Sequence, residues 1–306
     1  MIFSQLEYMV ALARERHFAR AAESCSVSQP ALSEGIRKLE VELDVPLIRR
    51  GNRFEGLTAE GEQIVVWARR ILADRKALTE QISAMRSGVT GQLRIGAIPT
   101  ASPAVSVLTA AFCAAHPLAN VHVASDLRSE DVLRLLADFE IDAGITYVGG
   151  PVPDGFRVTR LYFEKHVLLT ADERGAFGGS TVGWSDAAGL PLCLLDRSMQ
   201  GRRQVDDALR DVGLTAAPRL ETDSVALLLA QMKAGQWSTI VPAAWLHVFE
   251  LPRGVRALRL VGPERQAEVG LVTLSREPET VLARALTAVA RAADLTFLEN
   301  QPADQL

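Results

Sequence analysis

The fold of the N-terminal part is decided by residues 18–33, which read FARAAESCSVSQPALS. Phe18, Ala21 and Ala22 give a short helix with small side chains, and a tight turn follows it. Ser28 then suits the N-cap of another helix, and Pro30 suits the first turn of that helix, where a missing N–H costs nothing. Apolar residues at helical spacing flank this stretch on both sides, so the sequence predicts a three-helix unit. The flanking residues are Leu6, Met9, Val10 and Ala13 before it, and Leu32, Ile36, Leu39 and Leu43 within and after it.

The outward face of the third predicted helix carries side chains that can read DNA. In a helix-turn-helix its N-terminal residues enter the major groove, where Gln pairs with adenine and Ser bonds to base edges. Three arginines among five residues, with glycines around a turn, follow this helix and are typical of a wing that holds phosphates. The candidate DNA-binding residues are Ser28, Gln29, Pro30, Ser33, Glu34, Arg37, Lys38, Arg49, Arg50 and Arg53.

The pattern alone leaves two interpretations, because an amphipathic three-helix unit with a serine cap also occurs in ordinary globular proteins. The phrase FARAAESCSVSQPALS, continued through Leu43 to LTAEG at residues 57–61, resembles the DNA-binding end of the LysR-type transcriptional regulators. The resemblance implies a winged helix-turn-helix that binds double-stranded promoter DNA as a homodimer or homotetramer. Glu34 and Gly35 depart from the family, whose members often carry a basic or amide pair there, so we expect a less basic recognition surface.

Composition indicates a globular chain of more than one domain. The 306 residues are 48% hydrophobic and 23% charged, and the sequence shows neither an apolar run that could cross a bilayer nor a signal core. We therefore expect a cytoplasmic protein without a membrane partner. Residues 1–91 carry a net charge of +1 and the remainder −5. Any basic surface is thus local, and we expect specificity to come from a multimer that reads several half-sites.

Three cysteines lie far apart in the sequence, at Cys25, Cys113 and Cys193. They show no metal-ligand spacing, and we expect neither a metal nor a cofactor. Buried structural thiols are the favoured interpretation, because free cysteine behaves as a small hydrophobe. A redox-sensing pair is the alternative, since residues distant in sequence can be close in space.

A long helix is expected to connect the two parts of the chain, capped by Thr58 and running to about Ser87. Its apolar stripe needs a partner, which is either the chain's own body or a second copy. The stripe comprises Ile64, Trp67, Ile71, Leu78, Ile82 and Met85. The resemblance favours a second copy, because LysR-type regulators dimerise through this segment. The expected boundaries are 1–58 for the DNA-binding domain, 59–87 for the linker helix, 88–91 for a hinge and 92–306 for an effector-binding domain.

From Leu93 the sequence alternates between strand and helix patterns, which predicts an α/β fold with parallel βαβ units. Two such sets follow one another, and a helix from Pro278 closes the chain. Two α/β lobes of this kind resemble the Rossmann-like type 2 periplasmic binding proteins, the fold that LysR-type regulators carry as their sensing domain. We expect lobe I over residues 92–160 and 268–298, and lobe II over 161–267.

Ligands of open α/β sheets bind beyond the carboxyl ends of strands, at helix N-termini. Four segments of the predicted lobes meet this description, and their hydroxyls, N–H groups and arginines favour a small anion such as a carboxylate. In this interpretation Ser102 caps a helix and Arg202, or a neighbour, supplies a countercharge from the other lobe. The candidate effector-binding residues are Pro99, Thr100, Ala101, Ser102, Thr146, Tyr147, Met199, Gln200, Arg202, Thr222, Asp223 and Ser224. The alternative is that Ser102, Ser129 and Ser224 only cap helices; Ser129 is assigned that role, and His166 is taken as an ordinary strand residue.

The sequence predicts a regulator and not an enzyme, because it contains no nucleophile elbow, glycine-rich phosphate loop or metal-spaced set of histidines and carboxylates. An effector between the lobes would change their relative angle and thereby the spacing or bending of bound DNA. RNA polymerase is a candidate further partner. Two alternatives stay open: a constitutive DNA-binding protein whose α/β domain does not respond to a ligand, and an enzyme on the α/β end.

Overall fold

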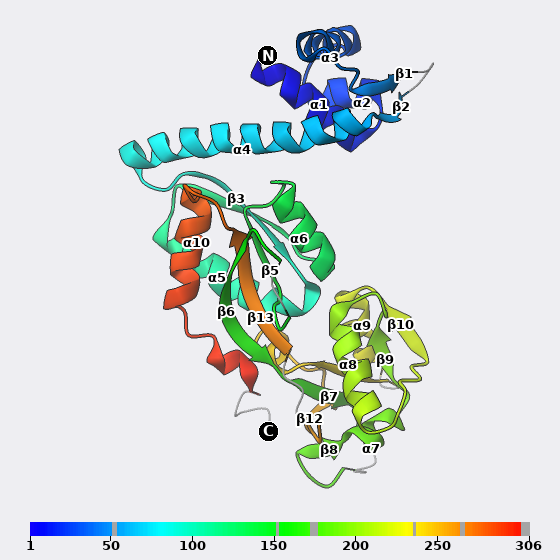
Figure 1. Ribbon diagram of the computed structural model, residues 1–306. Helices are drawn as coiled ribbons and strands as arrows, with labels where there is room; N and C mark the ends of the chain where they lie inside the picture. Colours follow the sequence, from blue (N-terminus) through cyan, green and yellow to red (C-terminus); the bar gives the residue numbers. More distant parts are fainter. Residues whose placement is uncertain (51–53, 151–152, 172–176, 235–236, 264–266, 301–306) are drawn as a thin grey trace. The chain divides into compact units, whose positions relative to one another are not determined.

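The chain folds into two compact units, Met1–Gly88 and Val89–Leu306, which we describe separately (Figure 1). The computed structural model describes all residues except 51–53, 151–152, 172–176, 235–236, 264–266 and 301–306. The N-terminal unit contains α1 (Phe3–Glu15), α2 (Phe18–Ser24), α3 (Gln29–Leu43), β1 (Ile48–Arg50), β2 (Phe54–Leu57) and α4 (Ala59–Ser87). The Ser28 hydroxyl accepts a hydrogen bond from the Ala31 N–H at 3.4 Å, and Pro30 lies in the first turn of α3, so both predictions for the start of this helix are confirmed.

Two residues of α3 fix its contacts with the rest of the unit. A Cβ at Gly35 would lie 2.6 Å from the Tyr8 ring, so glycine at this position lets α1 approach closely. Glu40 is buried, and its Oε1 accepts hydrogen bonds from the N–H groups of Leu47 (2.9 Å) and Ile48 (3.3 Å). This carboxylate ties the first strand of the wing to α3, because buried N–H groups must find acceptors.

The connecting helix α4 has the predicted cap and end, since the Thr58 hydroxyl accepts from the Gly61 N–H at 2.9 Å and the helix ends at Ser87. Its apolar stripe is not uniform. Ile64 and Ile71 pack against the core of the N-terminal unit, within the same chain. By contrast Trp67 is exposed, and so are three residues of the C-terminal half, Leu78, Ile82 and Met85. The surface available to another molecule is therefore mainly the second half of the helix.

The first lobe of the C-terminal unit is a five-stranded sheet with helices on both faces. Its strands have the order β4-β3-β5-β13-β6, and α5 and α10 cover one face while α6 covers the other (Figure 1). The elements are β3 (Gly91–Ala97), η1 (Pro99–Ala101), α5 (Ser102–Ala115), β4 (Ala119–Ala124), α6 (Ser129–Ala137), β5 (Ala143–Tyr147), β6 (Phe156–Glu164), β13 (Ala267–Leu274), α10 (Val281–Ala292) and η3 (Thr296–Glu299). Strands β3, β4 and β5 are parallel as predicted, but β13 runs antiparallel to both neighbours, so the sheet is mixed.

The second lobe has a four-stranded sheet in the order β11-β7-β12-β8 and a separate parallel pair, β9 and β10. Its elements are β7 (His166–Thr170), β8 (Thr181–Gly183), α7 (Trp184–Ala188), β9 (Cys193–Leu195), α8 (Gln200–Asp211), β10 (Leu220–Thr222), α9 (Val225–Lys233), β11 (Ser238–Pro242), η2 (Ala243–His247) and β12 (Arg256–Val261). Strand β7 pairs antiparallel with β11 and with β12, which again departs from an all-parallel arrangement.

The chain crosses between the lobes at Lys165, not near residue 160 as expected. Strand β6, which sequence analysis missed, pairs with β13 as far as Glu164↔Ala267, and β7 begins at His166 in the other sheet. Only two of the nine side chains of β6 are buried and they stand at its end, so the strand lacks a sustained apolar alternation that would mark it in the sequence. The final helix begins at Val281 behind the Thr280 cap, three residues later than the expected start at Pro278.

Candidate functional site

The start of α3 presents the predicted DNA-reading side chains to solvent. Ser28, Gln29 and Pro30 are exposed at its N-terminus, and Ser33 follows one turn later on the same face, half-buried. Arg49 is exposed at the wing. The Arg50 side chain and the whole of Arg53 lie outside the described residues.

Glu34 forms ion pairs with Arg37 and Lys38, two of the side chains that were predicted to contact phosphates. The Nε and Nη2 atoms of Arg37 each donate to a different Glu34 oxygen at 2.8 Å, and the Lys38 Nζ lies 3.9 Å from the same carboxylate. The hydrogen bonds from Arg37 hold the pKa of Glu34 below its usual value, so the carboxylate is ionised at neutral pH. The outward face of α3 therefore carries less free positive charge than its sequence indicates.

In the C-terminal unit, the carboxyl ends of β3 and β5 lie side by side where the strand order reverses, which is where open α/β sheets bind ligands. Thr100 follows β3 in the short helix η1, and Tyr147 ends β5. The prediction that Ser102 caps α5 is wrong. Ser102 is already helical, and its hydroxyl donates to the Pro99 carbonyl at 2.7 Å, which closes η1 onto α5. Ser129 is likewise the first residue of α6 and not its cap.

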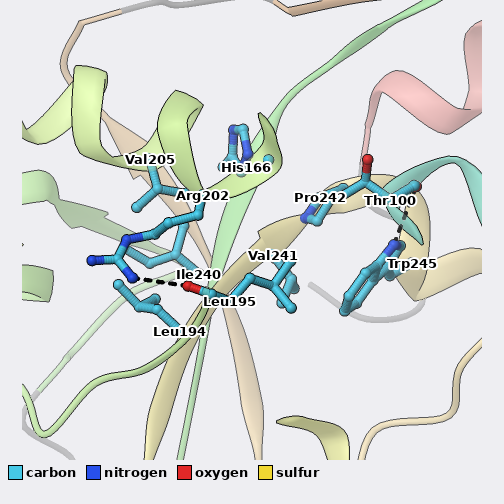
Figure 2. Close-up of a pocket in the computed structure, with 11 residues that line it drawn as sticks. Thr100, His166, Leu194, Leu195, Arg202, Val205, Ile240, Val241, Pro242 and Trp245 are labelled. Atoms are coloured by element: carbon cyan, nitrogen blue, oxygen red, sulfur yellow. Dashed lines mark hydrogen bonds between the residues drawn. The ribbon is translucent and has the colours of Figure 1, made fainter. Parts of the chain in front are cut away.

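A small pocket with a cavity volume of about 10 Å³ lies between the two lobes (Figure 2). The first lobe contributes Thr100, and the second lobe contributes residues of β7, β9, α8 and β11 and Trp245 of η2. The Trp245 Nε1 donates to the Thr100 carbonyl at 3.2 Å, so this indole joins the lobes at the pocket wall. The lining residues are Thr100, His166, Leu194, Leu195, Gly201, Arg202, Val205, Ile240, Val241, Pro242 and Trp245.

The N-terminus of α8 packs directly against Thr100 beside this pocket. A Cβ at Gly201 would lie 2.9 Å from Thr100 Cγ2 and 3.3 Å from the Tyr147 hydroxyl, so only glycine permits the approach. Met199 holds the N-cap position, and within the described residues no side chain caps the helix. The first N–H groups of a helix have no acceptor inside it, and they favour an anion.

Arg202 does not act as the predicted countercharge for a ligand at Thr100. Its side chain is fully buried and is held by Asp206 (2.8 Å), Glu221 (2.7 Å) and the Leu195 carbonyl (2.8 Å). Figure 2 shows the guanidinium extending away from Thr100, toward Leu194 and Leu195. The two carboxylates already compensate the charge of this arginine, so its role in the described structure is to join α8 to β9 and β10.

A buried polar cluster that sequence analysis missed lies beside the pocket, at the crossing between the lobes. The Tyr147 hydroxyl bonds to the Thr100 hydroxyl (3.0 Å) and donates to Glu164 Oε1 (2.7 Å), and His166 Nε2 lies 3.6 Å from that oxygen. Burial raises the pKa of Glu164 to about 7, against hydrogen bonds from Tyr147 and Thr100 that lower it. Burial also lowers the pKa of His166 to about 4. His166 is thus neutral at pH 7, and no cation accompanies Glu164 in the described cluster.

The remaining predicted effector residues do not converge on this pocket. Met199, Asp223 and Ser224 line a larger open pocket of about 850 Å³ together with Asp126 and a mostly apolar face of α9. Ser224 caps α9 as predicted, accepting from the Leu227 N–H, and Thr222 accepts from the Ser224 N–H, so both hydroxyls serve the turn. Pro99, Ala101, Ser102, Thr146, Tyr147, Gln200 and Thr222 line neither of the two pockets.

Within the described part of the chain, no group of His, Cys, Asp or Glu could hold a metal ion. The same residues contain no helix long and apolar enough to span a membrane.

Both units match known protein families. Residues 3–62 match the bacterial regulatory helix-turn-helix protein, lysR family, and residues 86–294 match the LysR substrate binding domain. Over 277 residues the chain is 31% identical to the DNA-binding transcriptional dual regulator OxyR of Escherichia coli K12, covering 89% of each chain. It is 32% identical to a probable hydrogen peroxide-inducible genes activator of Streptomyces viridosporus, over 83% of this chain and 81% of the relative.

Solved structures of full-length regulators share the fold. A full-length OxyR variant from Pseudomonas aeruginosa aligns with a TM-score of 0.73 at 24% identity, over 98% of this chain and all of that chain. CbnR in complex with its target DNA aligns with a TM-score of 0.67 at 23% identity, over 95% and 99% of the two chains. The two family matches define a DNA-binding regulator joined to a substrate-binding domain. The chain belongs to the LysR family of transcriptional regulators.

We predict that Glu34→Gln strengthens DNA binding irrespective of sequence. The substitution releases Arg37 and Lys38 for phosphates, so the magnitude of the slope of log affinity against log salt should rise by about one unit for each of the two that gains a phosphate. Gel-shift titrations at several salt concentrations, on specific and random duplexes, measure this slope. The matched control is Glu23→Gln, an exposed carboxyl at the end of α2. Unchanged slopes for Glu34→Gln would contradict the release of these cations.

We further predict that Glu164→Gln removes the loss of folding stability that the parent protein shows as pH rises and Glu164 ionises. Since the pKa of Glu164 rises from 4.5 to about 7 on folding, the folded chain binds more protons between these values, and the free energy of unfolding falls as pH rises through them. The total is about 3 kcal/mol. Its neighbour His166 makes the free energy of unfolding rise with pH between 4 and 6.5, and it does so equally in the parent and in the Glu164→Gln variant. Urea denaturation of the variant and the parent should therefore diverge in favour of Gln between pH 5 and pH 8. Glu277→Gln, at an exposed carboxyl, is the control; parallel pH profiles for Glu164→Gln would refute the assignment.

Proposed function

We propose that this regulator binds promoter DNA through Gln29 and Ser33 of α3 and the arginines of the wing, and is switched by a small anion between the lobes. The observation that carries the proposal is the pocket between Thr100 and the uncapped N-terminus of α8, in a domain of the LysR substrate-binding type. Effector binding would shift the population toward one lobe angle and so alter the DNA complex. This mechanism implies RNA polymerase as a further partner. It also implies that the regulator works in the cytoplasm.

The chemistry of the pocket supports an anion of few atoms, such as a small carboxylate. The cavity volume of about 10 Å³ holds about one water molecule, so the lobes must move apart before such an anion can enter. The Thr100 hydroxyl and the start of α8 lie next to each other at the pocket, and the first N–H groups of α8 have no acceptor within the helix, so a donor-rich group of this kind would suit an anion once the lobes separate. Leu194, Leu195, Val205 and Ile240 supply an apolar wall for the remainder of the effector.

Sensing of hydrogen peroxide is the second candidate function, because relatives at about 31% identity carry that description. The cysteines of this chain offer it little support. Cys193 is buried in β9, and burial raises the pKa of its thiol; burial also raises the pKa of Cys25. Cys113 is exposed, contrary to the expectation of buried thiols, but it lies on α5 away from the lining of either pocket. A reactive cysteine needs a lowered pKa, so we favour the anion.

Thr100→Val should abolish the effector response while DNA binding survives. The substitution keeps the shape of the side chain and removes one hydrogen bond to a charged ligand, which costs roughly 1.5–3 kcal/mol, or about ten- to a hundredfold in affinity. A screen of small carboxylates by thermal shift, followed by titration of DNA binding with the best compound, measures the response. Thr109→Val, whose hydroxyl bonds only within α5, is the control. A variant that responds at the parental midpoint would place the effector elsewhere.

Dimerisation is proposed to use the exposed second half of α4. Leu78→Asp combined with Ile82→Asp should give monomers with the thermal stability of the parent, because both side chains are exposed in one chain. The monomers should bind a two-site operator weakly, since linked half-sites raise the effective concentration. Sedimentation velocity and gel shifts measure the two effects. Ile71, part of the earlier expected seam, is unsuitable because it packs against the N-terminal core. Intact dimers of the double variant would argue against this seam.

A further inference from the structure

The last described segment of the chain, η3 with Asn300, returns to the point where the chain crosses between the lobes (Figure 1). It is anchored in the core of the first lobe, where Leu295 and Leu298 are buried. Strand β6 is an edge strand, so N–H groups on its outer side have no strand partner, and the Phe163 N–H donates instead to Glu299 Oε1 at 3.1 Å. The segment is therefore fixed to the first lobe by two buried leucines and by a hydrogen bond to the end of β6.

The same segment also reaches the second lobe. At the crossing itself, the Lys165 Nζ donates to Asn300 Oδ1 at 3.2 Å. His247 of η2 donates from Nε2 to the Asn300 carbonyl at 2.8 Å, and its ring packs edge-on against Phe297 with the ring centroids 5.1 Å apart. A carbonyl oxygen only accepts hydrogen bonds, so the Nε2 atom carries the proton. The C-terminal segment thus contacts both the crossing and the lobe beyond it.

The first lobe also holds η2 from another side. Two residues before His247, the Trp245 Nε1 donates to the Thr100 carbonyl, and Ala244 is buried in the core of the first lobe. The short helix η2 is therefore held by η1 through Trp245 and by η3 through His247. In this arrangement the lobes are closed, since the pocket between them has room for about one water molecule. Separation of the lobes requires η2 to leave these contacts.

The two attachments of the C-terminal segment differ in burial. On the side of the first lobe, Leu295 and Leu298 are at most 2% exposed. On the side of the second lobe, Phe297 is 44% exposed, Asn300 is exposed and His247 is half-buried. Contacts close to solvent open at a lower free-energy cost than contacts within a core. When the lobes separate, the segment therefore stays with the first lobe and parts from the second.

We propose that residues 296–300 form a strap that holds η2 of the second lobe on the first lobe, and that release of His247 from Asn300 and Phe297 lets the lobes open. The inference goes beyond the proposed function, because the strap acts in the chain without an effector. Loss of one neutral hydrogen bond should raise the population of open lobes by about two- to tenfold, and loss of the ring contact adds to this effect. An effector that needs open lobes should bind His247→Ala more tightly by the same factor.

The test measures the distance between the lobes in the full-length protein by pulsed electron paramagnetic resonance. Spin labels are attached to cysteines introduced by Ala137→Cys on α6 and Ser185→Cys on α7, two exposed positions in different lobes. The labelled chain also carries Cys25→Ser and Cys113→Ser, while Cys193 is buried. An excess of unlabelled chains restricts the signal to distances within one chain, whatever the oligomeric state.

His247→Ala and Phe297→Ala should each lengthen and broaden the distribution of distances between the lobes, because they remove the same contact from opposite sides. The matched control is His116→Ala. The His116 ring also contacts a phenylalanine, with centroids 5.0 Å from those of Phe112, but both residues belong to the first lobe. Its loss should leave the distribution unchanged. Circular dichroism and thermal melting of each variant show whether it is folded.

Two results would overturn the strap. One is a pair of distributions, for His247→Ala and Phe297→Ala, that superimpose on that of the parent. The other is an equal change in His116→Ala, because loss of a histidine–phenylalanine contact within one lobe would then have the same effect. If one strap variant misfolds, the other decides the question. Since no effector is added, failure of every small carboxylate to bind would refute the anion proposal and leave the strap standing.

Discussion

The junction between the two lobes of the C-terminal unit is built around one buried carboxyl, that of Glu164. Glu164 is the last residue of β6, and the chain crosses to the second lobe immediately after it. A buried carboxylate without a cation is costly, so the site stabilises this group with the Tyr147 hydroxyl and by retaining its proton up to about pH 7. Thr100, Tyr147 and His166 come from three different elements. Thr100, Tyr147 and Glu164 belong to the first lobe, so the second lobe meets this network through His166, whose Nε2 lies 3.6 Å from Glu164 Oε1.

Local signals made the N-terminal unit predictable from sequence. The caps of α3 and α4 depend on Ser28, Thr58 and their neighbours within three residues, and these predictions hold. The candidate pocket was predicted only in part, because its residues act through distant partners. Arg202 appears in the sequence as a basic residue after a strand, yet Glu221, 19 residues away, neutralises it. Glu164 lies in a strand without apolar alternation, and its desolvation arises from tertiary packing that no local pattern reports.

Membership of the LysR family fixes the architecture but not the ligand. At about 31% identity the relatives share both units, and the names of several concern hydrogen peroxide. Function on a shared fold is decided by the side chains of the site. Here the lining combines hydroxyl, helix N-terminus and aliphatic side chains, and contains no cysteine among its described members. A binding equilibrium with a small solute suits this lining better than thiol oxidation does.

The energetics of such a switch favour an oligomer. Converting a two-state equilibrium from 1:99 to 99:1 requires a ligand that prefers one state by about 5.5 kcal/mol. One hydrogen bond to a charged ligand supplies about 1.5–3 kcal/mol, so a pocket with few donors falls short by itself. Two pockets coupled through a shared dimer seam add their preferences, because both lobes must then change together. On the DNA side, Glu34 already neutralises part of α3, so a single subunit would gain little from phosphates. In the proposed mechanism, sensing and DNA reading therefore both use the exposed half of α4.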